Sequence, residues 1–569
     1  MGQEVQYILE SKRLVWLVAV VFAVVVMFQY LEFPYGDVSS SMFSVHRAQP
    51  PLSQTNQTKT SSEIPKSTGN NTIKFISPPP SSDSTTSPPS STSASLTPTI
   101  TVNNTVVAPS IALDNNTLKP EVNPPNLNPN FKKPAPSENK PAMSTGEPQV
   151  KELPPVQERP IGDIVTLSDM HDILLHNRAS VRSMKPQWPL MVDQELLAAK
   201  LQIEKAPINN NDRALYSPLY RNVSRFKRSY ELMEKTLKVY VYQEGEKPIF
   251  HQPQAVLSGI YASEGWFMKH MKENKHFVTN NPKEAHLFYI PFSSRTLEEK
   301  LYVTGSRSRD NLVQHLKDYI HLIAGRYDSW NRTGGSDHFL VACHDWATDE
   351  TRKSMNSCIR ALCNSDVGKE HFELGKDVSL PETYVRSTQN PLRELGGKPA
   401  SQRSTLAFFA GQMHGDVRPI LLHYWENKDP DMKIFQKLPK SKGNRNYINY
   451  MKTSKYCICA KGYEVNSPRV VEAIFHECVP VIISDNFVPP FFEILNWESF
   501  AVFVEEKDIP NLKNILLSIS NRRYLVMQQR VKRVQQHFLW HAKPVKYDIF
   551  HMILHSIWYN RVFRVDPVS

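Results

Sequence analysis

A short polar run near the end of the chain combines residue types that bind phosphate and ribose groups. Ser467 is a favoured residue immediately before a helix, and Pro468 suits the first helical position, where no N–H is missed. Arg469 lies in the first turn, where its guanidinium can reach a phosphate with a forked pair of donors. Glu472 follows three residues later on the same helix face, where a carboxylate can accept hydrogen bonds from two ribose hydroxyls. The run predicts an anion site, or alternatively a solvated pair of Arg469 and Glu472 on a capped helix.

Two strongly apolar segments flank this run and place it at the edge of a sheet. YCIC before it and VPVIIS after it are typical of buried strands, and SPRVVEAIFH is typical of the helix between them. Ligands of open parallel sheets bind at the carboxyl ends of the strands. The connecting loop AKGYEVN therefore faces a bound ligand, with Gly462 permitting close approach and Lys461 adding positive charge.

Strand-like and helix-like segments alternate in two successive sets. KVYVY, HLFYIPF and HFLVAC belong to the first set, and TLAFFAG, KYCICA and VPVIIS belong to the second. This alternation predicts an α/β fold with two parallel sheets, each covered on both faces, in two Rossmann-like domains with a cleft between them. The predicted segments are a helical neck at 161–235, a first domain at 236–398, a second, ligand-binding domain at 399–540, and a C-terminal helix at 541–569 that packs back on the first domain.

The N-terminal part has the composition of a membrane anchor followed by a spacer. Residues 14–31 are almost entirely apolar and are long enough to cross a bilayer core of about 30 Å. Because Lys12 and Arg13 precede this span, we expect a cytosolic tail at 1–13 and a type II, single-pass protein whose remainder is luminal. A cleaved signal peptide is the alternative, although the apolar run exceeds the usual length of about 7–15 residues. The Pro-, Ser- and Thr-rich region 32–160 offers too little apolar surface to fold and is predicted to be a disordered stem.

Other features agree with a luminal location. Six N-x-S/T acceptor sites follow the predicted span, at Asn56, Asn70, Asn103, Asn115, Asn222 and Asn331. All six cysteines also follow it, and their even number permits disulfides, with Cys358 and Cys363 close enough in sequence to suggest a local bridge. The formal charge of +11 fits an anionic substrate, a polysaccharide or a solvated basic surface. A luminal address excludes nucleic acid as a partner.

Three long segments carry a resemblance to a known family. They are KVYVYQEGEKPIFHQPQAVLSGIYASEGWFMKHM, TLAFFAGQMHGDVRPILLHYWENKDPDM and YCICAKGYEVNSPRVVEAIFHECVPVIISDNFVPPF. In this order they resemble the plant exostosin-like glycosyltransferases of family 47, over about Lys238 to Phe563. The resemblance implies the two-domain GT-B fold and an inverting enzyme of the Golgi membrane that uses a nucleotide sugar, with a UDP-sugar as the favoured donor. The implied acceptor is a cell-wall polysaccharide or a glycoprotein.

The resemblance also implies roles for single residues. Arg469 is implied as a diphosphate contact, and Glu472 as a contact to the ribose or uracil side of the donor. Gly411 and Arg418, in GQMHGDVR, resemble a second glycine turn and helix start that face the same cleft. The expected donor-binding set consists of Gly411, Arg418, Lys461, Gly462, Ser467, Arg469 and Glu472.

The strand HFLVAC is followed directly by two residues that can move a proton, His344 and Asp345. An inverting transfer needs one general base to deprotonate the acceptor hydroxyl while the nucleotide diphosphate leaves. We expect Asp345 to be this base, with His344 as the second choice and Asp337 or His338 after them. Alternatively, these side chains satisfy buried backbone groups beside Trp346.

Two acidic patterns suggest chemistry that the resemblance does not support. Glu464 and Glu472 are spaced like the paired glutamates of some retaining GT-B enzymes, but an inverting family gives Glu464 no catalytic role. Asp429-Pro430-Asp431 matches a D-x-D manganese motif, yet it lies in a turn after a helix rather than at the end of an apolar strand. We therefore expect no metal and no cofactor, with cationic side chains and the helix dipole neutralising the diphosphate.

Two other classes of function stay open from the sequence. The same fold without catalysis would serve as a scaffold subunit of a polysaccharide-synthesising complex, alongside other Golgi glycosyltransferases. A carbohydrate-binding module without a nucleotide site would bind its acceptor independently of UDP. Saturable binding of UDP separates an active donor site from both alternatives.

Overall fold

The computed structural model describes residues 164–208, 214–369, 372–438 and 445–565. The predicted cytosolic tail, membrane span and stem lie outside these residues, as do the acceptor sites Asn56, Asn70, Asn103 and Asn115. Asn222 and Asn331 are described, and both are exposed. Within the described ranges, no helix is both long and apolar enough to cross a membrane.

Six parallel strands form the first sheet. They are β1 (Val239–Val241), β2 (Val278–Thr279), β3 (Leu287–Tyr289), β4 (His338–Ala342), β5 (Ile359–Leu362) and β6 (Val378–Ser379), in the spatial order β2-β1-β3-β4-β5-β6. All neighbours in this sheet run parallel, with Phe288 opposite His338 and Val341 opposite Ala361. Strands β4 and β5 are buried along their whole length, which explains why their sequences are continuous apolar runs rather than alternating ones.

Helices cover both faces of the first sheet. On one face, Phe267 of α5 (Ala262–Glu273) packs against Tyr289 and Phe339. On the other face, Leu316 of α7 (Asp310–Arg326) belongs to the apolar cluster that contains Leu340. Consecutive residues of β4 thus point to opposite layers, as expected for a strand. The other helices of this region are η2 (Pro253–Val256), η3 (Pro282–Glu284), α6 (Ser294–Leu301), α8 (Asp328–Thr333) and α9 (Ala347–Arg352).

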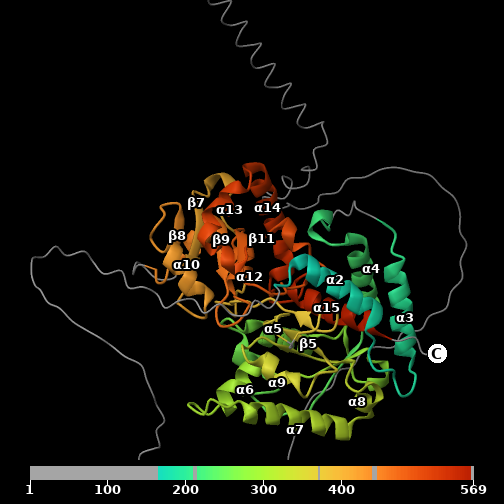
Figure 1. Cartoon of the computed structure of the whole chain (residues 1–569). Coiled ribbons are helices and arrows are strands. Elements are labelled where there is room, and N and C mark those ends of the chain that lie inside the picture. Colours follow the sequence, from blue (N-terminus) through green and yellow to red (C-terminus); the bar gives the residue numbers. More distant parts are fainter. Residues whose placement is uncertain (1–163, 209–213, 370–371, 439–444, 566–569) are drawn as a thin grey trace, which may run out of the picture. The chain divides into compact units, whose positions relative to one another are not determined.

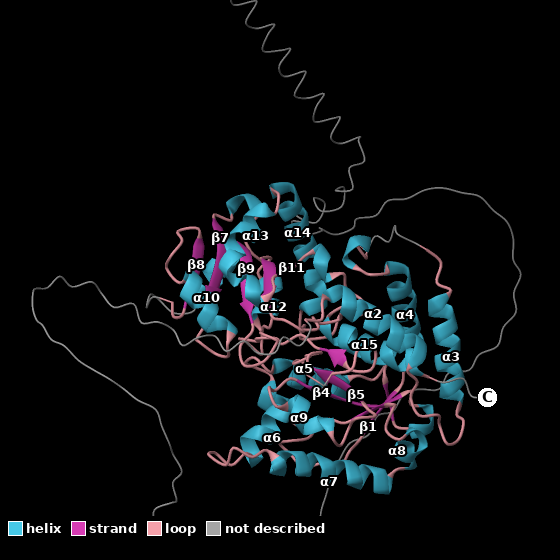
Figure 2. Ribbon diagram, in the orientation of Figure 1, coloured by secondary structure: helices cyan, strands magenta, loops and turns pink. Residues whose placement is uncertain are grey.

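Five parallel strands form the second sheet. They are β7 (Thr405–Ala410), β8 (Met432–Phe435), β9 (Ser454–Ala460), β10 (Val479–Ile483) and β11 (Val502–Phe503), in the order β11-β10-β9-β7-β8. Figure 2 shows these strands in magenta among their helices. The helices are η4 (Ala400–Gln402), α10 (Val417–Trp425), α11 (Arg445–Thr453), α12 (Arg469–Phe475), η5 (Trp497–Ser499), η6 (Glu506–Asn511), α13 (Leu512–Ser518) and α14 (Asn521–Val534). The prediction of an α/β fold with two parallel sheets is confirmed.

The neck helices and the C-terminal helix lie together (Figure 1). The neck contains α2 (Leu167–Ser180), α3 (Met191–Glu204), η1 (Ser217–Leu219) and α4 (Val223–Thr236), and the chain ends with η7 (Gln535–Phe538) and α15 (Ile549–Arg564). α15 contacts α3 and α4 on one side and β5 and β6 of the first sheet on another. A buried hydrogen bond between His555 Nε2 and Ser229 Oγ, 2.7 Å long, ties α15 to α4. The C-terminal segment therefore crosses from the second sheet back to the first.

Two disulfides link neighbouring strands, and neither is the bridge that sequence proximity suggested. Cys343 pairs with Cys363, and Cys457 pairs with Cys478. Cys358 is buried and free. The expected bridge between Cys358 and Cys363 is wrong because β5 runs between them, and five residues of strand separate their Cα atoms by about 16 Å. A disulfide requires Cα atoms within about 7 Å.

Candidate functional site

A cavity of about 760 Å³ lies where the carboxyl ends of strands from both sheets meet. Asp345 and Glu382, which follow β4 and β6, line it from the first sheet. Gly411, Gln436 and Gly462, which follow β7, β8 and β9, line it from the second. This is the place at which parallel sheets bind their ligands.

Helix α12 begins with Arg469, one residue later than the sequence predicted. Pro468 occupies the position before the helix, and its side chain provides no capping hydrogen bond. Ser467 is buried; its Oγ accepts from the backbone N–H of Arg469 at 3.4 Å and from Arg469 Nη1 at 3.1 Å. Ser467 therefore orients the arginine side chain as well as the start of the helix.

Two arginines enter the cavity through space that two glycines leave open. The Nε and Nη2 of Arg469 donate to the carbonyl oxygen of Ala410 at 3.2 and 2.8 Å. A Cβ at Gly411 would lie 2.6 Å from Arg469 Nη2. Arg418 is 7% exposed and donates through Nε to Ala460 O at 3.3 Å, and a Cβ at Gly462 would lie 2.9 Å from its Nη2. Gly411, after β7, thus makes room for the arginine of α12, and Gly462, after β9, makes room for the arginine of α10.

The electrostatics of this wall favour an anion. Burial, together with the neighbouring Arg469, lowers the pKa of Arg418 to about 10, so the Arg418 side chain remains cationic at neutral pH. Two like charges held this close are relieved by a bound anion. A third cation of the expected set, Lys461, forms an ion pair with Glu506 Oε1 at 3.1 Å.

A further glycine brings the two glycine loops into close contact. Gly415 has a φ of +69°, and a Cβ at this position would lie 1.8 Å from the carbonyl oxygen of Gly462. Only glycine fits this combination of backbone angle and close approach. Beside it, the rings of His414 and Tyr463 stack at 5.0 Å, and both residues line the cavity.

Glu472 is held by residues that the sequence did not indicate. It is 6% exposed, and its carboxylate accepts from Tyr447 OH at 2.9 Å and from Arg386 Nη2. The alternative of a solvated pair with Arg469 is wrong, because Glu472 is buried and its ion pair is with Arg386, on the segment that leads from β6 to the second sheet.

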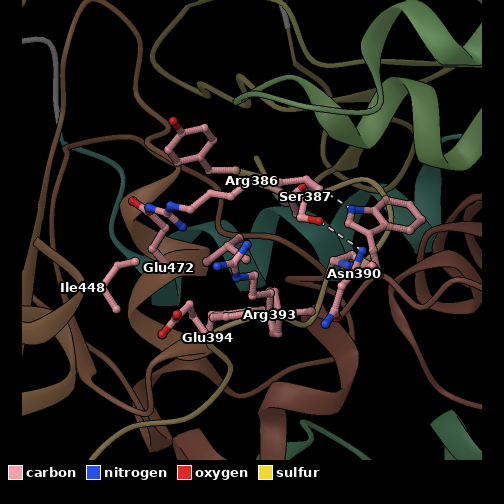
Figure 3. A pocket seen from close by; sticks show the side chains of 15 residues that line it. Arg386, Ser387, Asn390, Arg393, Glu394, Ile448 and Glu472 are labelled. Atoms are coloured by element: carbon pink, nitrogen blue, oxygen red, sulfur yellow. Dashed lines mark hydrogen bonds and ion pairs between the residues drawn. The ribbon is translucent and has the colours of Figure 1, made fainter. Parts of the chain in front are cut away.

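The pair of Arg386 and Glu472 also borders a second cavity, of about 260 Å³ (Figure 3). Figure 3 shows the Arg386 guanidinium beside the Glu472 carboxylate, with Ile448 and Arg393 around the space next to them. Phe475, Phe538 and Trp540 add apolar surface. Because Arg386 and Glu472 line both cavities, this ion pair forms part of the wall between them.

His344 and Asp345, which follow Cys343 after the end of β4, lie in different environments. Asp345 lines the cavity, and the hydroxyl of Tyr261 and the side chain of Asn364 donate to it; burial nevertheless raises its pKa. His344 is 6% exposed and packs edge-on against the rings of Tyr261 and Trp346, and burial lowers its pKa to about 3. At neutral pH His344 is therefore uncharged and serves as a packing residue beside Asp345.

The third-choice pair, Asp337 and His338, lies at the amino end of β4, opposite to the cavity. Both are buried, and Asp337 accepts from Thr333 Oγ1 and pairs with His338 and Arg332. Burial alone would raise the pKa of Asp337, but the hydrogen bond and charge of His338, together with Arg561, lower it to about 2. These residues form a structural network of buried side chains rather than contacts to backbone groups beside Trp346.

The remaining acidic residues of the sequence prediction fall in two places. Glu464 lines the cavity, and burial raises its pKa to about 7. Asp429 and Asp431 both pair with Lys513, at 2.5 and 3.2 Å, in a surface turn away from the cavity. Among the residues that the structure describes, no group of three or more histidine, cysteine or acidic side chains is arranged to hold a metal.

Three lining residues, Glu382, Arg386 and Tyr447, were not indicated by the sequence. Glu382 and Arg386 belong to LPETYVRS, an irregular segment without periodicity or a recognisable motif. Tyr447 lies on α11, where an aromatic residue is more often part of the core. Only the meeting of these segments in three dimensions marks them as lining residues.

The Exostosin GT47 domain matches residues 233–519, which include both sheets and every residue named above that lines the larger cavity. The chain belongs to the exostosin GT47 family. It is 43% identical over 400 residues to "Probable glycosyltransferase At5g03795" of Arabidopsis thaliana, a match that covers 68% of this chain and 76% of the relative. A second Arabidopsis relative, "Probable glycosyltransferase At5g25310", is 43% identical over 383 residues, covering 65% and 78% of the two chains. This GT47 protein is therefore a glycosyltransferase.

Among solved structures, the GT47 chain matches Anabaena Alr3699/HepE in complex with UDP-glucose with 10% identity and a TM-score of 0.29. That match covers 56% of this chain and 97% of the other.

Proposed function

We propose that this GT47 glycosyltransferase transfers a sugar from a nucleotide sugar, a UDP-sugar in the first instance, with inversion at the anomeric carbon. The observation that carries the proposal is that Arg469 and Arg418, from helices of the second sheet, line the same cavity as the carboxylates of Asp345 and Glu382, from the first sheet. Displacement of a diphosphate by a hydroxyl requires cations at the leaving group and a proton acceptor at the attacking oxygen. The cavity supplies both.

The proposed acceptor is a cell-wall polysaccharide or a glycoprotein. Two more distant relatives support a glycan acceptor by their names: "Probable glucuronosyltransferase GUT1" of rice and "Probable beta-1,4-xylosyltransferase IRX10" of Arabidopsis, each 29% identical to this chain. Two parallel sheets with a cavity between their carboxyl ends support a GT-B arrangement. The apolar segment 14–31 supports a type II anchor in the Golgi membrane, with the cavity on the luminal side.

The arginines are positioned before any donor binds. Three nitrogens of Arg469 are occupied by Ala410 O and Ser467 Oγ, which fixes the plane of the guanidinium. An arginine has five N–H donors, so two remain for a diphosphate. Since these charges need no rearrangement when the anomeric bond to the diphosphate breaks, they stabilise the leaving group efficiently. Glu472 contributes acceptor oxygens for the ribose hydroxyls from the same helix.

A donor screen with the full-length chain tests the proposal. Each UDP-sugar is supplied with and without a glycan acceptor, and UDP release is followed in the presence and absence of a chelator. We expect release with at least one donor, unchanged by the chelator because Arg469 and Arg418 neutralise the diphosphate. Loss of release in chelator would contradict the metal-free part, and absence of saturable UDP binding would favour a scaffold instead.

Substitution of Arg469 tests the donor contact itself. A charge-assisted, forked contact contributes about 1.5–3 kcal/mol, so Arg469→Ala should weaken UDP binding by about 10- to 150-fold. Arg469→Lys keeps the charge but loses the fork, and should fall between this variant and the native protein. Arg522→Ala, on the exposed side of α14, is the matched control and should bind UDP normally. Equal affinity in all variants would remove Arg469 from the donor site.

A further inference from the structure

Glu382 enters the cavity from the first sheet, three residues after β6 ends. It is 6% exposed, and in the described part of the chain no hydrogen bond or ion pair reaches its carboxylate. Burial of an unpaired carboxylate is costly, and such groups therefore call for an explanation. The carboxylate lines the same cavity as Arg469 and Arg418. A substrate bound in this cavity would supply the hydrogen-bond partner that the carboxylate lacks.

The backbone on both sides of Glu382 is fixed. The carbonyl oxygen of Pro381 accepts from Ser263 Oγ at 2.7 Å, and Thr383 Oγ1 accepts from Trp540 Nε1 at 3.0 Å. Ser263 lies on α5 and Trp540 precedes α15, so two separate elements hold the segment. Glu382 is thus an unpaired carboxylate on a rigid support, which is the arrangement that proton transfer at a fixed position requires.

The charges around Glu382 suit a proton acceptor. Burial raises its pKa well above that of an ordinary glutamate, and Asp345 and Glu472 raise it further. Arg469 and Arg418 act in the opposite direction and favour the ionised form. A general base works best when its pKa lies close to the operating pH rather than near 4, because a carboxylate of ordinary pKa binds the proton weakly.

Asp345 is less suited to the same role. Burial raises the pKa of Asp345 as well, but its carboxylate already accepts from the hydroxyl of Tyr261 and from the side chain of Asn364, and both bonds stabilise the ionised form. A carboxylate that already accepts two hydrogen bonds has less tendency to take up a proton. These two bonds suit a residue that orients the acceptor hydroxyl.

We propose that Glu382, rather than Asp345, accepts the proton of the acceptor hydroxyl in the transfer reaction. As the acceptor oxygen forms its bond to the anomeric carbon, the O–H bond breaks and the proton moves to the Glu382 carboxylate. The bond between the anomeric carbon and the diphosphate breaks, and its electron pair leaves with the diphosphate beside Arg469 and Arg418. The protonated Glu382 then returns its proton to water. This inference rests on the proposed function, since it needs a bound donor.

The test compares three glutamine or asparagine variants of the full-length chain with the native enzyme. Glu382→Gln and Asp345→Asn keep the side-chain volume, and Glu273→Gln, exposed at the end of α5, is the control. We expect Glu382→Gln to lower kcat by at least about 100-fold, because general base catalysis contributes about 10²- to 10⁴-fold. UDP affinity should stay the same or increase, since a negative charge near the diphosphate is removed. Retained UDP binding also shows that the variant is folded.

The pH profile supplies the second readout. In the native enzyme kcat should fall as the pH drops below the pKa of Glu382, and this acid limb should vanish in Glu382→Gln but persist in Asp345→Asn. A Glu382→Gln variant within about threefold of native kcat, or one that keeps the acid limb, would overturn the inference while leaving the function intact. A native chain that neither binds UDP nor releases it from any donor would overturn both.

Discussion

The two disulfides of this protein close loops of nearly equal length but lie at different distances from the cavity, and this offers an internal control. Cys343 and Cys363 are 20 residues apart in sequence, and Cys457 and Cys478 are 21 apart. In the chain-entropy description, opening either loop costs about 3.3 kcal/mol at 25 °C. Replacement of either pair by alanines should therefore destabilise the chain by about the same amount, which corresponds to roughly 4 °C in Tm for a folded chain of this size, at about 2.1 cal/mol/K per residue.

The effects on activity should differ sharply. Cys343 follows the last residue of β4 and directly precedes His344 and Asp345, and Cys363 directly precedes Asn364, whose side chain hydrogen-bonds Asp345. This disulfide therefore joins the loop that carries the cavity residue Asp345 to the loop that carries its hydrogen-bond partner Asn364. Cys478 precedes β10, at the amino end of that strand and away from the cavity.

We expect Cys343→Ala/Cys363→Ala to lower kcat at least tenfold at a temperature where it is still folded, because a loop misplaced by about 1 Å can cost 10²-fold. Cys457→Ala/Cys478→Ala should keep native kcat. Urea unfolding followed by tryptophan fluorescence measures the stability of both variants, and UDP release measures activity. Equal losses of activity, or stability losses that differ by more than about 1.5 kcal/mol, would refute the reasoning.

Three further predictions address single features. Burial raises the pKa of Glu350 to about 8, so at neutral pH the folded state holds this proton while the unfolded state loses it. The free energy of unfolding should therefore fall by at most about 3 kcal/mol from pH 4.5 to pH 7. Glu350→Gln should remove this pH dependence, as measured by urea unfolding at each pH. Asn222 and Asn331 should each carry a glycan, so each Asn→Gln variant should gain one step in electrophoretic mobility. Only the Asn222 variant should also lose about 1 kcal/mol, because this residue caps α4 through its side-chain oxygen. Gly411→Ala should weaken UDP binding almost as much as Arg469→Ala with little change in Tm, because the added methyl group displaces the flexible end of the arginine.

Local patterns in the sequence were sufficient for the sheets and for the wall that carries the arginines. Buried parallel strands are continuous apolar runs, so β4, β9 and β10 could be recognised without their neighbours. The helix after β9 could be recognised from Ser467 and Pro468, although it starts one residue later than expected. Features of this kind depend on a few adjacent residues.

Features that depend on distant residues could not be predicted. The expected bridge between Cys358 and Cys363 relied on nearness in sequence, whereas a disulfide between parallel strands joins residues at the same end of neighbouring strands. Glu382 and Arg386 lie in an irregular segment, and their positions depend on contacts with α5, α12 and the residues before α15. No periodicity marks such residues, because their partners are far away along the chain.

The two glycine loops show that a correct interpretation of each loop by itself can miss how the two loops are connected. Each loop contains a glycine after a strand and an arginine on the helix that follows, and the sequence indicates two similar but separate elements. In the structure the elements are interlocked: Gly411 after β7 admits Arg469 of α12, and Gly462 after β9 admits Arg418 of α10. Because β7 and β9 are neighbours in the sheet, this exchange places both guanidinium groups at one point, which two independent loops would not achieve. The cationic wall therefore depends on the strand order. A substitution at the glycine of either loop should displace the arginine on the helix that follows the other loop.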